Sequence, residues 1–493
     1  MGRGIAQVAA AAGIEVWLFD VDEEALDDAI VFTTRMIKRA AEKGRMSEDA
    51  CEIAIANINR ADNLQMLAGC HLVIEAIVEN LEIKQGLFKQ LEEIVGVDTI
   101  LASNTSSLSI SAIAAACERP ELVAGYHFFN PVPLMGLVEI ISGLRTAPGT
   151  IDKLVELTKR IDKTAVQVID SPGFLVNHAG RGFNTEALRI LSEQIADVAT
   201  IDMILRDGVG FRLGPFELMD ITALDVSHPV MEQVYHQFYE EPRYRPQPIT
   251  QRRMNAGLLG RKTNEGFYRY QDNKKINAPA RIPKGKASRI KSVYLADKKW
   301  NASKLFIKEL KARKIKSTKS PKDADICVVI PYGMDCTTAA LQAKLPPERT
   351  VAVDPCPGFD GFPIFSKLAV VMTNPATDKL LAEDFASLLH SKERPCVIIN
   401  DSPGFVAQRV LAQIVNVGSE IAQQGLATPE DIEKAVELGL GYPKGPLGLG
   451  DQMGAHYCSV ILNELYAFYG DPRYRLSPWL KRRALLKRPL LAP

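Results

Sequence analysis

Short apolar runs alternate with longer amphipathic stretches over the first third of the chain. The runs IEVWLFD, HLVIEAI, TILASN, LVAGYHFF and AVQVID have the length and the β-branched content of strands. Residues 22–45, 81–95 and 150–160 repeat their apolar positions at helical spacing. This alternation predicts a parallel sheet with crossover helices, so we expect residues 1–169 to form one α/β domain.

The strand pattern stops after the run DSPGF, which begins at Asp170. Amphipathic helical patterns continue from there to about Asn255, so residues 170–270 are expected to form an all-α domain. A Pro-dotted segment rich in Lys and Arg follows, and we interpret residues 271–320 as a linker. The strand-like runs ADICVVIPYG, TVAVDPC and LAVVMTNP predict a second, smaller α/β unit over residues 321–395.

An internal repeat defines the last domain. VQVIDSPGFLVNHAGRGFNTEA has a counterpart in CVIINDSPGFVAQRVLAQIVNVGSEI, GVGFRLGPFELMD in GLGYPKGPLGLGD, and YHQFYEEPRYRPQP in YAFYGDPRYRLSPW. Matched stretches that recur in the same order indicate a duplication. Residues 396–493 are therefore predicted to form a second helical domain.

The composition is that of an ordinary folded chain. It is 46% hydrophobic and 24% charged, with 59 Lys and Arg against 59 Asp and Glu, so neither disorder nor a nucleic-acid or membrane partner is indicated. The 8 cysteines include no CxxC pair, which argues against a metal site or a disulfide framework. No apolar run reaches the about 18 to 20 residues of a membrane span, and no secretory signal pattern opens the chain. We expect a cytoplasmic protein without a metal.

Asp20, at the end of the run VWLFD, is a candidate cofactor ligand. In a doubly wound sheet an acidic residue at the end of the second strand binds the ribose hydroxyls, and its charge repels the additional phosphate of NADP. NAD is therefore the expected cofactor. From position alone, an Asp that caps the next helix is an equal alternative. The glycine fingerprint that should precede Asp20 is reduced to MGRG, which is weak evidence by itself.

His127 and Glu139 are the candidate catalytic pair. They lie on adjacent strand-like segments joined by a Pro-rich turn, so the carboxylate can hold the imidazole in one tautomer. A histidine oriented by a glutamate is an arrangement for a general base that acts on an alcohol. A lone histidine at a strand end is more often structural. However, a carboxylate in the apolar run LVEII is costly to bury unless it has a partner.

A set of motifs in one order and spacing carries a family resemblance: MGRGIAQ, SNTSSLSI, GYHFFNPVPLMGLVEI, DSPGFLVN and GPFELMD. Over nearly its whole length the chain resembles the L-3-hydroxyacyl-CoA dehydrogenase family of fatty acid β-oxidation. Its second α/β unit and second helical domain resemble the long bacterial subgroup, which includes the 3-hydroxyadipyl-CoA and 3-hydroxybutyryl-CoA dehydrogenases. The resemblance implies a Rossmann-like NAD-binding domain over residues 1–169 and a reduced, non-catalytic Rossmann-like unit over residues 321–395.

The resemblance also implies roles for individual residues. His127 is the implied general base, Glu139 orients it, and Ser106 and Asn177 hold the substrate oxygen. The residues implied at the cofactor are Gly2, Asp20, Glu79, Lys84 and Asn104. Without the family pattern, Ser106 would be interpreted as a helix N-cap and Asn177 as a polar helix start.

Lys38 and Lys43 are candidates for binding the phosphates of CoA, since they lie on the basic helical stretch RMIKRAAEKGR. A solvated helix face gives the same pattern. One departure from the family lies directly after Asn177, where His178 stands in place of the more usual Arg.

The resemblance places the start of the chain at an internal Met of the family's glycine fingerprint, with Gly2 as its last glycine. The first strand and the two glycines of the phosphate turn would then be absent. Neighbouring strands would carry unpaired backbone groups, each costing about 1 to 3 kcal/mol if buried. We expect a chain of this kind to bind NAD poorly.

The implied reaction is the NAD-dependent oxidation of a (3S)-hydroxyacyl-CoA to the 3-ketoacyl-CoA. Two alternatives stay open: a non-catalytic binding or structural protein on a dehydrogenase scaffold, and an NAD-dependent dehydrogenase of a small hydroxy acid without CoA. In the family's short members the helical domain pairs with its copy on another subunit. The second helical domain would supply that surface within one chain, as an internal pseudo-dimer. Acyl-chain preference and homo-oligomerisation also stay open.

Overall fold

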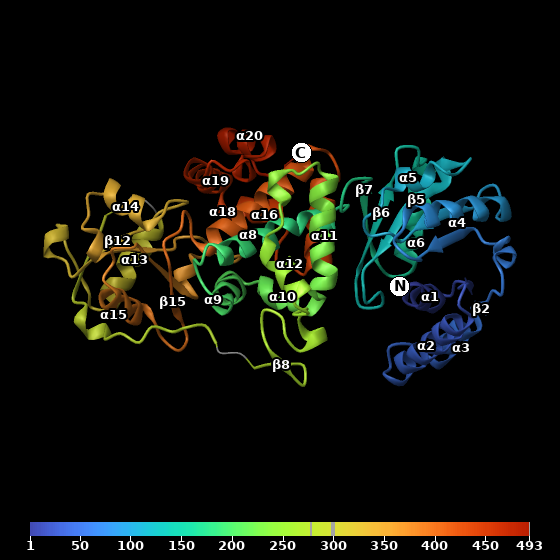
Figure 1. Cartoon of the computed structure of the whole chain (residues 1–493), viewed down its shortest axis with the longest axis horizontal. Coiled ribbons are helices and arrows are strands. Elements are labelled where there is room, and N and C mark those ends of the chain that lie inside the picture. Colours follow the sequence, from blue (N-terminus) through green and yellow to red (C-terminus); the bar gives the residue numbers. More distant parts are fainter. Residues whose placement is uncertain (277–278, 297–300, 493) are drawn as a thin grey trace. The chain divides into compact units, whose positions relative to one another are not determined.

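The computed structural model describes residues 1–276, 279–296 and 301–492. It divides into two compact parts, of which the first contains residues 1–178 and 425–440 and the second contains residues 179–424 and 441–493. Figure 1 shows the helices and strands of both parts coloured along the sequence. The residues 425–440 of the second helical domain therefore belong to the same compact part as the first α/β domain.

The first part is built on a five-stranded sheet with strand order β3-β4-β5-β6-β7. Its strands are β3 (Leu72–Glu75), β4 (Ile100–Ser103), β5 (Val123–Phe128), β6 (Leu137–Ser142) and β7 (Thr164–Ile169). Two shorter strands, β1 (Val16–Leu18) and β2 (Ile58–Arg60), form a separate parallel pair. Strands β4 and β5 are buried at every residue, as is usual for central strands that are covered on both faces.

Several helices of the first part begin at a side chain that caps them. Asp22 accepts the N–H groups of Glu24 and Ala25, and Asn80 accepts the N–H of Ile83. The helices are α1 (Gly2–Ala11), α2 (Glu23–Glu42), α3 (Glu48–Ala56), α4 (Leu81–Ile94), α5 (Ile110–Ala114), α6 (Pro148–Arg160), α7 (Val176–Ala179) and α17 (Pro429–Leu440). The predicted helices at 22–45, 81–95 and 150–160 thus correspond to α2, α4 and α6.

The five-stranded sheet is mixed, whereas the alternation of strands and helices predicted a parallel one. β5 and β6 are antiparallel. Only the short turn with Pro131 and Pro133 joins them, and a parallel connection needs a crossover of a dozen or more residues. The antiparallel register places His127 directly opposite Glu139.

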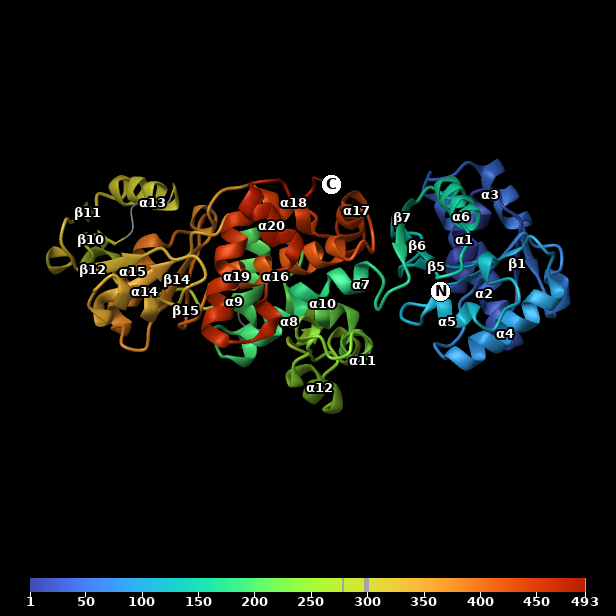
Figure 2. The ribbon, with the colours of Figure 1, turned by 90° about the horizontal axis from the view of Figure 1, so that it is seen from above.

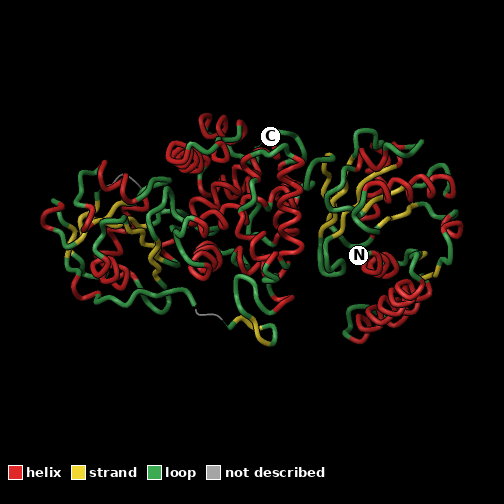
Figure 3. The backbone as a smooth tube through the Cα atoms, in the orientation of Figure 1, coloured by secondary structure: helices red, strands yellow, loops and turns green. Residues whose placement is uncertain are grey.

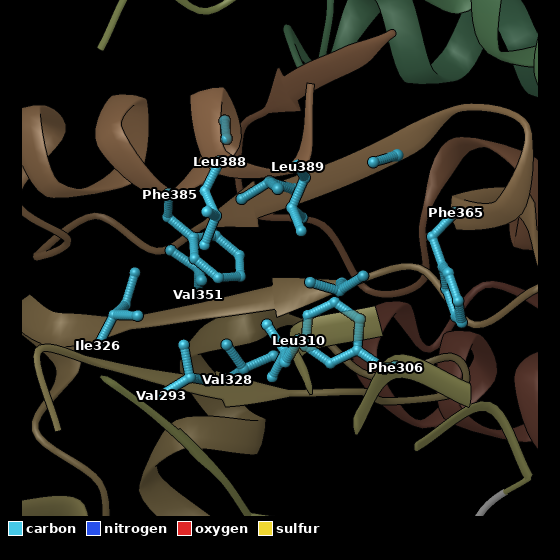
Figure 4. Close-up of a cluster of buried hydrophobic side chains, with 14 of the residues drawn as sticks. Val293, Phe306, Leu310, Ile326, Val328, Val351, Phe365, Phe385, Leu388 and Leu389 are labelled. Atoms are coloured by element: carbon cyan, nitrogen blue, oxygen red, sulfur yellow. The ribbon is translucent and has the colours of Figure 1, made fainter. Parts of the chain in front are cut away.

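The second part contains a six-stranded sheet with strand order β11-β10-β12-β13-β14-β15. Its strands are β10 (Ser292–Leu295), β11 (Lys316–Ser317), β12 (Ile326–Val329), β13 (Thr350–Val353), β14 (Ala369–Thr373) and β15 (Cys396–Ile399). Figure 4 shows its core, in which Phe306 and Leu310 of one helix and Phe385, Leu388 and Leu389 of another point toward the strands. β13 and β14 are antiparallel, as β5 and β6 are in the first sheet.

Much of the segment interpreted as a linker, residues 271–320, folds with this second sheet. It contains β10, β11 and α13 (Asn301–Ala312), while its residues 277–278 and 297–300 lie outside the described residues. Val293 and Leu295 of β10 are fully buried. A four-residue strand between lysines and arginines is too short to show a period of two, and its pairing with β12 is what identifies it.

The second part also contains further helices. They are α8 (Arg181–Ser192), α9 (Val198–Met203), α10 (Pro215–Thr222), α11 (Leu224–Gln237), α12 (Pro248–Asn255), α14 (Cys336–Gln342), α15 (Lys379–Leu389), α16 (Val406–Gln423), α18 (Pro446–Met453), α19 (Ala455–Tyr469) and α20 (Pro478–Leu486). A small hairpin consists of β8 (Tyr270–Gln271) and β9 (Lys274–Lys275). Nearly every residue of α16 is buried, because α8, α18, α19 and α20 pack around it (Figures 2 and 3). No described helix is both long and apolar enough to cross a membrane.

Ion pairs join the two copies of the repeated helical sequence. Arg409 on α16 donates from Nε to Oε1 of Glu186 on α8 over 2.8 Å, and both side chains are fully buried. Arg243 of the first copy pairs with Glu420 of the second over 2.6 Å. In the same direction, Arg189 of the first copy pairs with Asp471 of the second, also over 2.6 Å. The interface between the copies is therefore charged and specific as well as apolar.

Candidate active site

His127 and Glu139 form a buried hydrogen-bonded pair in the first part. Nδ1 of His127 lies 2.6 Å from Oε2 of Glu139. Glu139 is fully buried and His127 is 6% exposed. The rings of Phe129 and Phe174 lie 4.5 and 5.9 Å from the imidazole, centroid to centroid. Apolar walls of this kind restrict the ring and strengthen its bond to the carboxylate.

The second oxygen of Glu139 is held by the backbone. Oε1 accepts the N–H groups of Leu175 and Val176 over 3.0 and 2.8 Å. These N–H groups lie at the start of α7, directly before Asn177. The carboxylate thus links the imidazole to the segment that carries Asn177, and the structure brings these three predicted residues together.

The loop after β4 carries Asn104 and Ser106. Oδ1 of Asn104 accepts the backbone N–H of Phe128 over 2.8 Å, which ties this loop to the residue after His127. Oε1 of Glu79 accepts the N–H of Ser106 and the hydroxyls of Thr105 and Ser107, over 3.0, 2.6 and 2.8 Å. Burial alone would raise the pKa of Glu79, but these bonds and nearby Lys84 lower it below its ordinary value. Glu79 therefore holds the loop as a carboxylate.

Lys84 lies behind the same loop. It is 1% exposed, and its Nζ lies 2.5 Å from Oε1 of Glu75 and 3.5 Å from Oε2 of Glu79. Glu75 also accepts the hydroxyl of Ser103 over 2.7 Å. Glu75 is not among the site residues predicted from the sequence. The signal was present, since Glu75 interrupts the apolar run LVIEAI as Glu139 interrupts LVEII, and such a carboxylate requires partners.

The predicted cofactor end of the domain lies at α1 and β1. α1 starts at Gly2 with no side-chain cap, and, apart from its chain neighbours and the backbone of α1, no described atom lies within 4 Å of the place that a Cβ atom of residue 2 would take. The N–H groups at a helix N-terminus without a side-chain cap can bind a phosphate group. Asp20 is exposed, and Asp22 rather than Asp20 caps α2, so the capping alternative for Asp20 does not hold. These residues fit a dinucleotide.

The predicted CoA-binding lysines are exposed on α2. Lys38 lies within the helix, and Lys43 follows its last residue. Neither side chain has a hydrogen bond or ion pair among those identified within the described residues.

The second sheet carries different residues at the positions of the His/Glu pair. Val370 pairs with Val397 as Glu139 pairs with Val166, and both valines precede their copy of DSPGF by the same spacing. By the same register Asp354, whose N–H donates to the carbonyl of Val370, takes the place of His127. This place in the second sheet therefore has no imidazole and no glutamate.

Comparisons with known proteins cover both halves of the repeat. The family described as "3-hydroxyacyl-CoA dehydrogenase, NAD binding domain" matches residues 1–171. The family described as "3-hydroxyacyl-CoA dehydrogenase, C-terminal domain" matches twice, at residues 173–270 and 404–489. The second match coincides with the second copy of the repeated sequence.

Individual relatives match over two different lengths. The chain is 35% identical to the 3-hydroxyadipyl-CoA dehydrogenase of Escherichia coli K12, over 99% of this chain and 96% of that protein. It is 43% identical to a probable 3-hydroxybutyryl-CoA dehydrogenase of Deinococcus radiodurans, over 55% of this chain and 96% of that protein. A crystal structure of 3-hydroxybutyryl-CoA dehydrogenase from E. coli K12 matches with a TM-score of 0.85 and 34% identity, over 99% of this chain and 96% of that one.

Proposed function

The chain belongs to the 3-hydroxyacyl-CoA dehydrogenase family, and from this premise we propose how its residues carry out the reaction. It is an NAD-dependent 3-hydroxyacyl-CoA dehydrogenase, which oxidises a (3S)-hydroxyacyl-CoA to the 3-ketoacyl-CoA. The family assignment favours this activity over a non-catalytic scaffold and over a dehydrogenase of a small hydroxy acid without CoA.

We propose His127 as the general base, and the 2.6 Å contact between its Nδ1 and Glu139 carries this proposal. The carboxylate accepts a hydrogen bond from Nδ1–H, so the lone pair on Nε2 stays available to take the proton of the substrate hydroxyl. NAD, when bound, accepts the hydride from C3 of the substrate. Glu139 then stabilises the imidazolium. General-base catalysis of this kind contributes about 10²- to 10⁴-fold to the rate.

Ser106 and Asn177 are proposed to hold the substrate oxygen. Two contacts support their roles: Glu79 holds the backbone N–H of Ser106, and the N–H of Val176, the residue before Asn177, donates to Glu139. Carboxylates position both segments, the buried Glu139 and the more exposed Glu79, which lowers the reorganisation required when the substrate binds.

For the cofactor, we propose that the N-terminus of α1 at Gly2 binds the pyrophosphate and that Asp20 binds the adenosine ribose. Asn104 would act near the nicotinamide. Glu79 and Lys84 would act indirectly, by holding the loop that carries Asn104 and Ser106.

For the CoA moiety, we propose Lys38 and Lys43 on the exposed face of α2. The matched relatives carry names with different acyl groups, 3-hydroxyadipyl and 3-hydroxybutyryl. A comparison of kcat/KM for these two CoA esters will identify the preferred acyl chain. The corresponding free hydroxy acids test whether CoA is required.

We further propose that residues 396–493 act as the partner of the first helical domain, as an internal pseudo-dimer with one active site per chain. The buried pair of Arg409 with Glu186 supports this arrangement. A covalent link raises the effective concentration of the two copies, so the pairing does not require a second chain. Sedimentation of the purified protein tests whether it also forms a homo-oligomer.

The experiment that tests the proposed base compares His127→Gln with His71→Gln. His71 is an exposed histidine directly before β3, so it controls for the same chemical change within the same domain. We expect His127→Gln to lower kcat for NADH formation by at least about 10²-fold with little change in KM, and His71→Gln to leave both unchanged. A His127→Gln enzyme with nearly full kcat contradicts the proposal.

A further inference from the structure

Residues 425–440 of the second helical half fold against the first sheet. β7 is the last strand in the order β3-β4-β5-β6-β7 and so has a free edge toward this segment. The N–H of Ile169 donates to the carbonyl of Leu426 over 2.9 Å, and the N–H of Gln167 donates to the carboxylate of Asp431. Alternate residues of an edge strand direct their N–H groups outward. This segment therefore supplies acceptors to two N–H groups that the edge of β7 would otherwise leave unpaired.

The helix of this segment, α17, continues to the residues that flank Glu139. A Cβ atom added at Gly439 would lie 2.9 Å from Cγ2 of Val176 and 3.0 Å from Cδ2 of Leu137. The N–H of Val176 is one of the two that hold Glu139. Leu137 lies two residues before Glu139 on β6, so their side chains leave the strand on the same face. α17 therefore packs against Val176, whose N–H holds the carboxylate, and against Leu137, which shares a strand face with Glu139.

We propose that α17 of the second helical half is a positioning element of the active site, which holds Glu139 in place through Val176 and Leu137. Gly439 is the critical position, because its lack of a side chain lets the helix approach this closely. The proposal rests on the proposed role of His127 as the base. A purely structural role for α17 would stabilise the domain without affecting the rate of the chemical step.

The repeat supplies a matched control. DSPGF and GPFELMD align with their copies without an intervening gap, and this places Gly208 at the position of Gly439. A Cβ atom at Gly208 would lie 3.5 Å from Cγ2 of Ile364 and Cβ of Leu368, at the second sheet. That sheet carries Asp354 and not a histidine at the register position of His127. A larger residue at Gly208 therefore makes the same kind of packing change next to a sheet that lacks the His/Glu pair.

The experiment compares Gly439→Ala with Gly208→Ala and Gly208→Val in the full-length protein. The control is the Gly208 variant whose change in Tm equals that of Gly439→Ala. We expect Gly439→Ala to lower kcat by about 10- to 100-fold while KM changes less than about twofold, because a small displacement of the base costs rate and not binding. The ¹⁵N resonances of His127 should shift in this variant alone. The Gly208 variants should keep kcat.

Two further variants complete the experiment, one as a rescue and one as a replacement. Val176→Ala combined with Gly439→Ala removes the clashing methyl group and should restore part of kcat. If Gly439→Ala does not fold, Asp431→Ala takes its place, since it releases the start of α17 from β7 without adding an atom. The inference is overturned if Gly439→Ala, or its replacement, keeps kcat within about twofold or loses no more than the matched Gly208 variant. A His127→Gln enzyme that keeps its kcat refutes the proposed function instead, whatever α17 does.

Discussion

Oε2 of Glu139 lies 2.6 Å from Nδ1 of His127, while Oε1 of the same carboxylate accepts the N–H groups of Leu175 and Val176. Both oxygens are therefore committed. The two backbone N–H groups require an acceptor, so in a Gln side chain the amide oxygen would face them and the amide nitrogen would face the imidazole.

Glu139→Gln should consequently reverse the tautomer of His127. The amide oxygen would accept the two backbone N–H groups, and the amide N–H would donate to Nδ1, which moves the imidazole proton to Nε2. The base then cannot take the hydroxyl proton. We expect kcat to fall about 10²- to 10⁴-fold with the fold intact. Steady-state rates and histidine ¹⁵N spectra check both statements, and an unchanged tautomer with normal kcat would remove Glu139 from the mechanism.

The buried pair of Arg409 with Glu186 should be costly to break from one side. Arg409→Met leaves the Glu186 carboxylate buried without its main cation, so we expect a loss of about 3 to 5 kcal/mol in the free energy of unfolding. Adding Glu186→Leu should recover much of this loss. Lys434→Met, at the exposed pair with Glu430, is the control, with an expected change below about 1 kcal/mol. Denaturant titrations measure all three, and equal losses in the single and double variants argue against a direct pair.

Asp354 should make the protein less stable as pH rises. Burial raises the pKa of Asp354 to about 7, although Cys356 N–H and Gln408 donate to its Oδ1. Oδ2 has no hydrogen-bond partner within the described residues. The folded protein binds this proton more tightly than the unfolded chain, so the free energy of unfolding falls between about pH 4 and pH 7 and is level above that.

Asp354→Asn mimics the protonated carboxyl, so it should stabilise the protein above pH 7 by about 2 to 4 kcal/mol and leave stability at pH 4 nearly unchanged. Burial also raises the pKa of Asp202 to about 7, so part of the pH dependence remains. Asp325→Asn is the control of opposite sign: although burial opposes it, the N–H groups of Lys291 and Ser292 lower the pKa of Asp325. Thermal unfolding from pH 4 to 8 measures the difference, and parallel curves for wild type and Asp354→Asn would contradict the prediction.

Asp20 should control the choice between NAD and NADP. Asp20→Ala removes a charged acceptor for the ribose hydroxyls, and we expect the Kd for NAD to rise about 10- to 100-fold. The Kd for NADP should change little or fall, because a like charge is lost. Asp22→Ala is the control, since it removes the cap of α2 and should cost stability at an unchanged NAD to NADP ratio. Fluorescence titration of both cofactors decides between these outcomes, and an unaltered ratio in Asp20→Ala excludes the ribose contact.

Local patterns predicted most of the elements near the site, because the spacing of apolar residues within one segment indicates whether it forms a strand or a helix. β3, β4 and β5 lie within the predicted runs, β7 begins one residue before its run, and α4 and α6 match the predicted helices within two residues at each end. The antiparallel pairing of β5 with β6 and the strand β10 were not predicted. Both are decided by hydrogen bonds to a neighbouring strand, which one segment read by itself does not contain.

The site shows the same division. Sequence alone determined the family and its candidate residues, including His127, Glu139, Ser106 and Asn177, because the motifs are contiguous and their chemistry is a property of residue type. Only the tertiary structure decided that the backbone of Leu175 and Val176 holds Glu139, that Glu75 and Lys84 support the loop of Ser106, and that α17 reaches β7. The reason is physical: these contacts join groups that are distant along the chain, and their energy depends on burial and geometry that exist only in the folded protein.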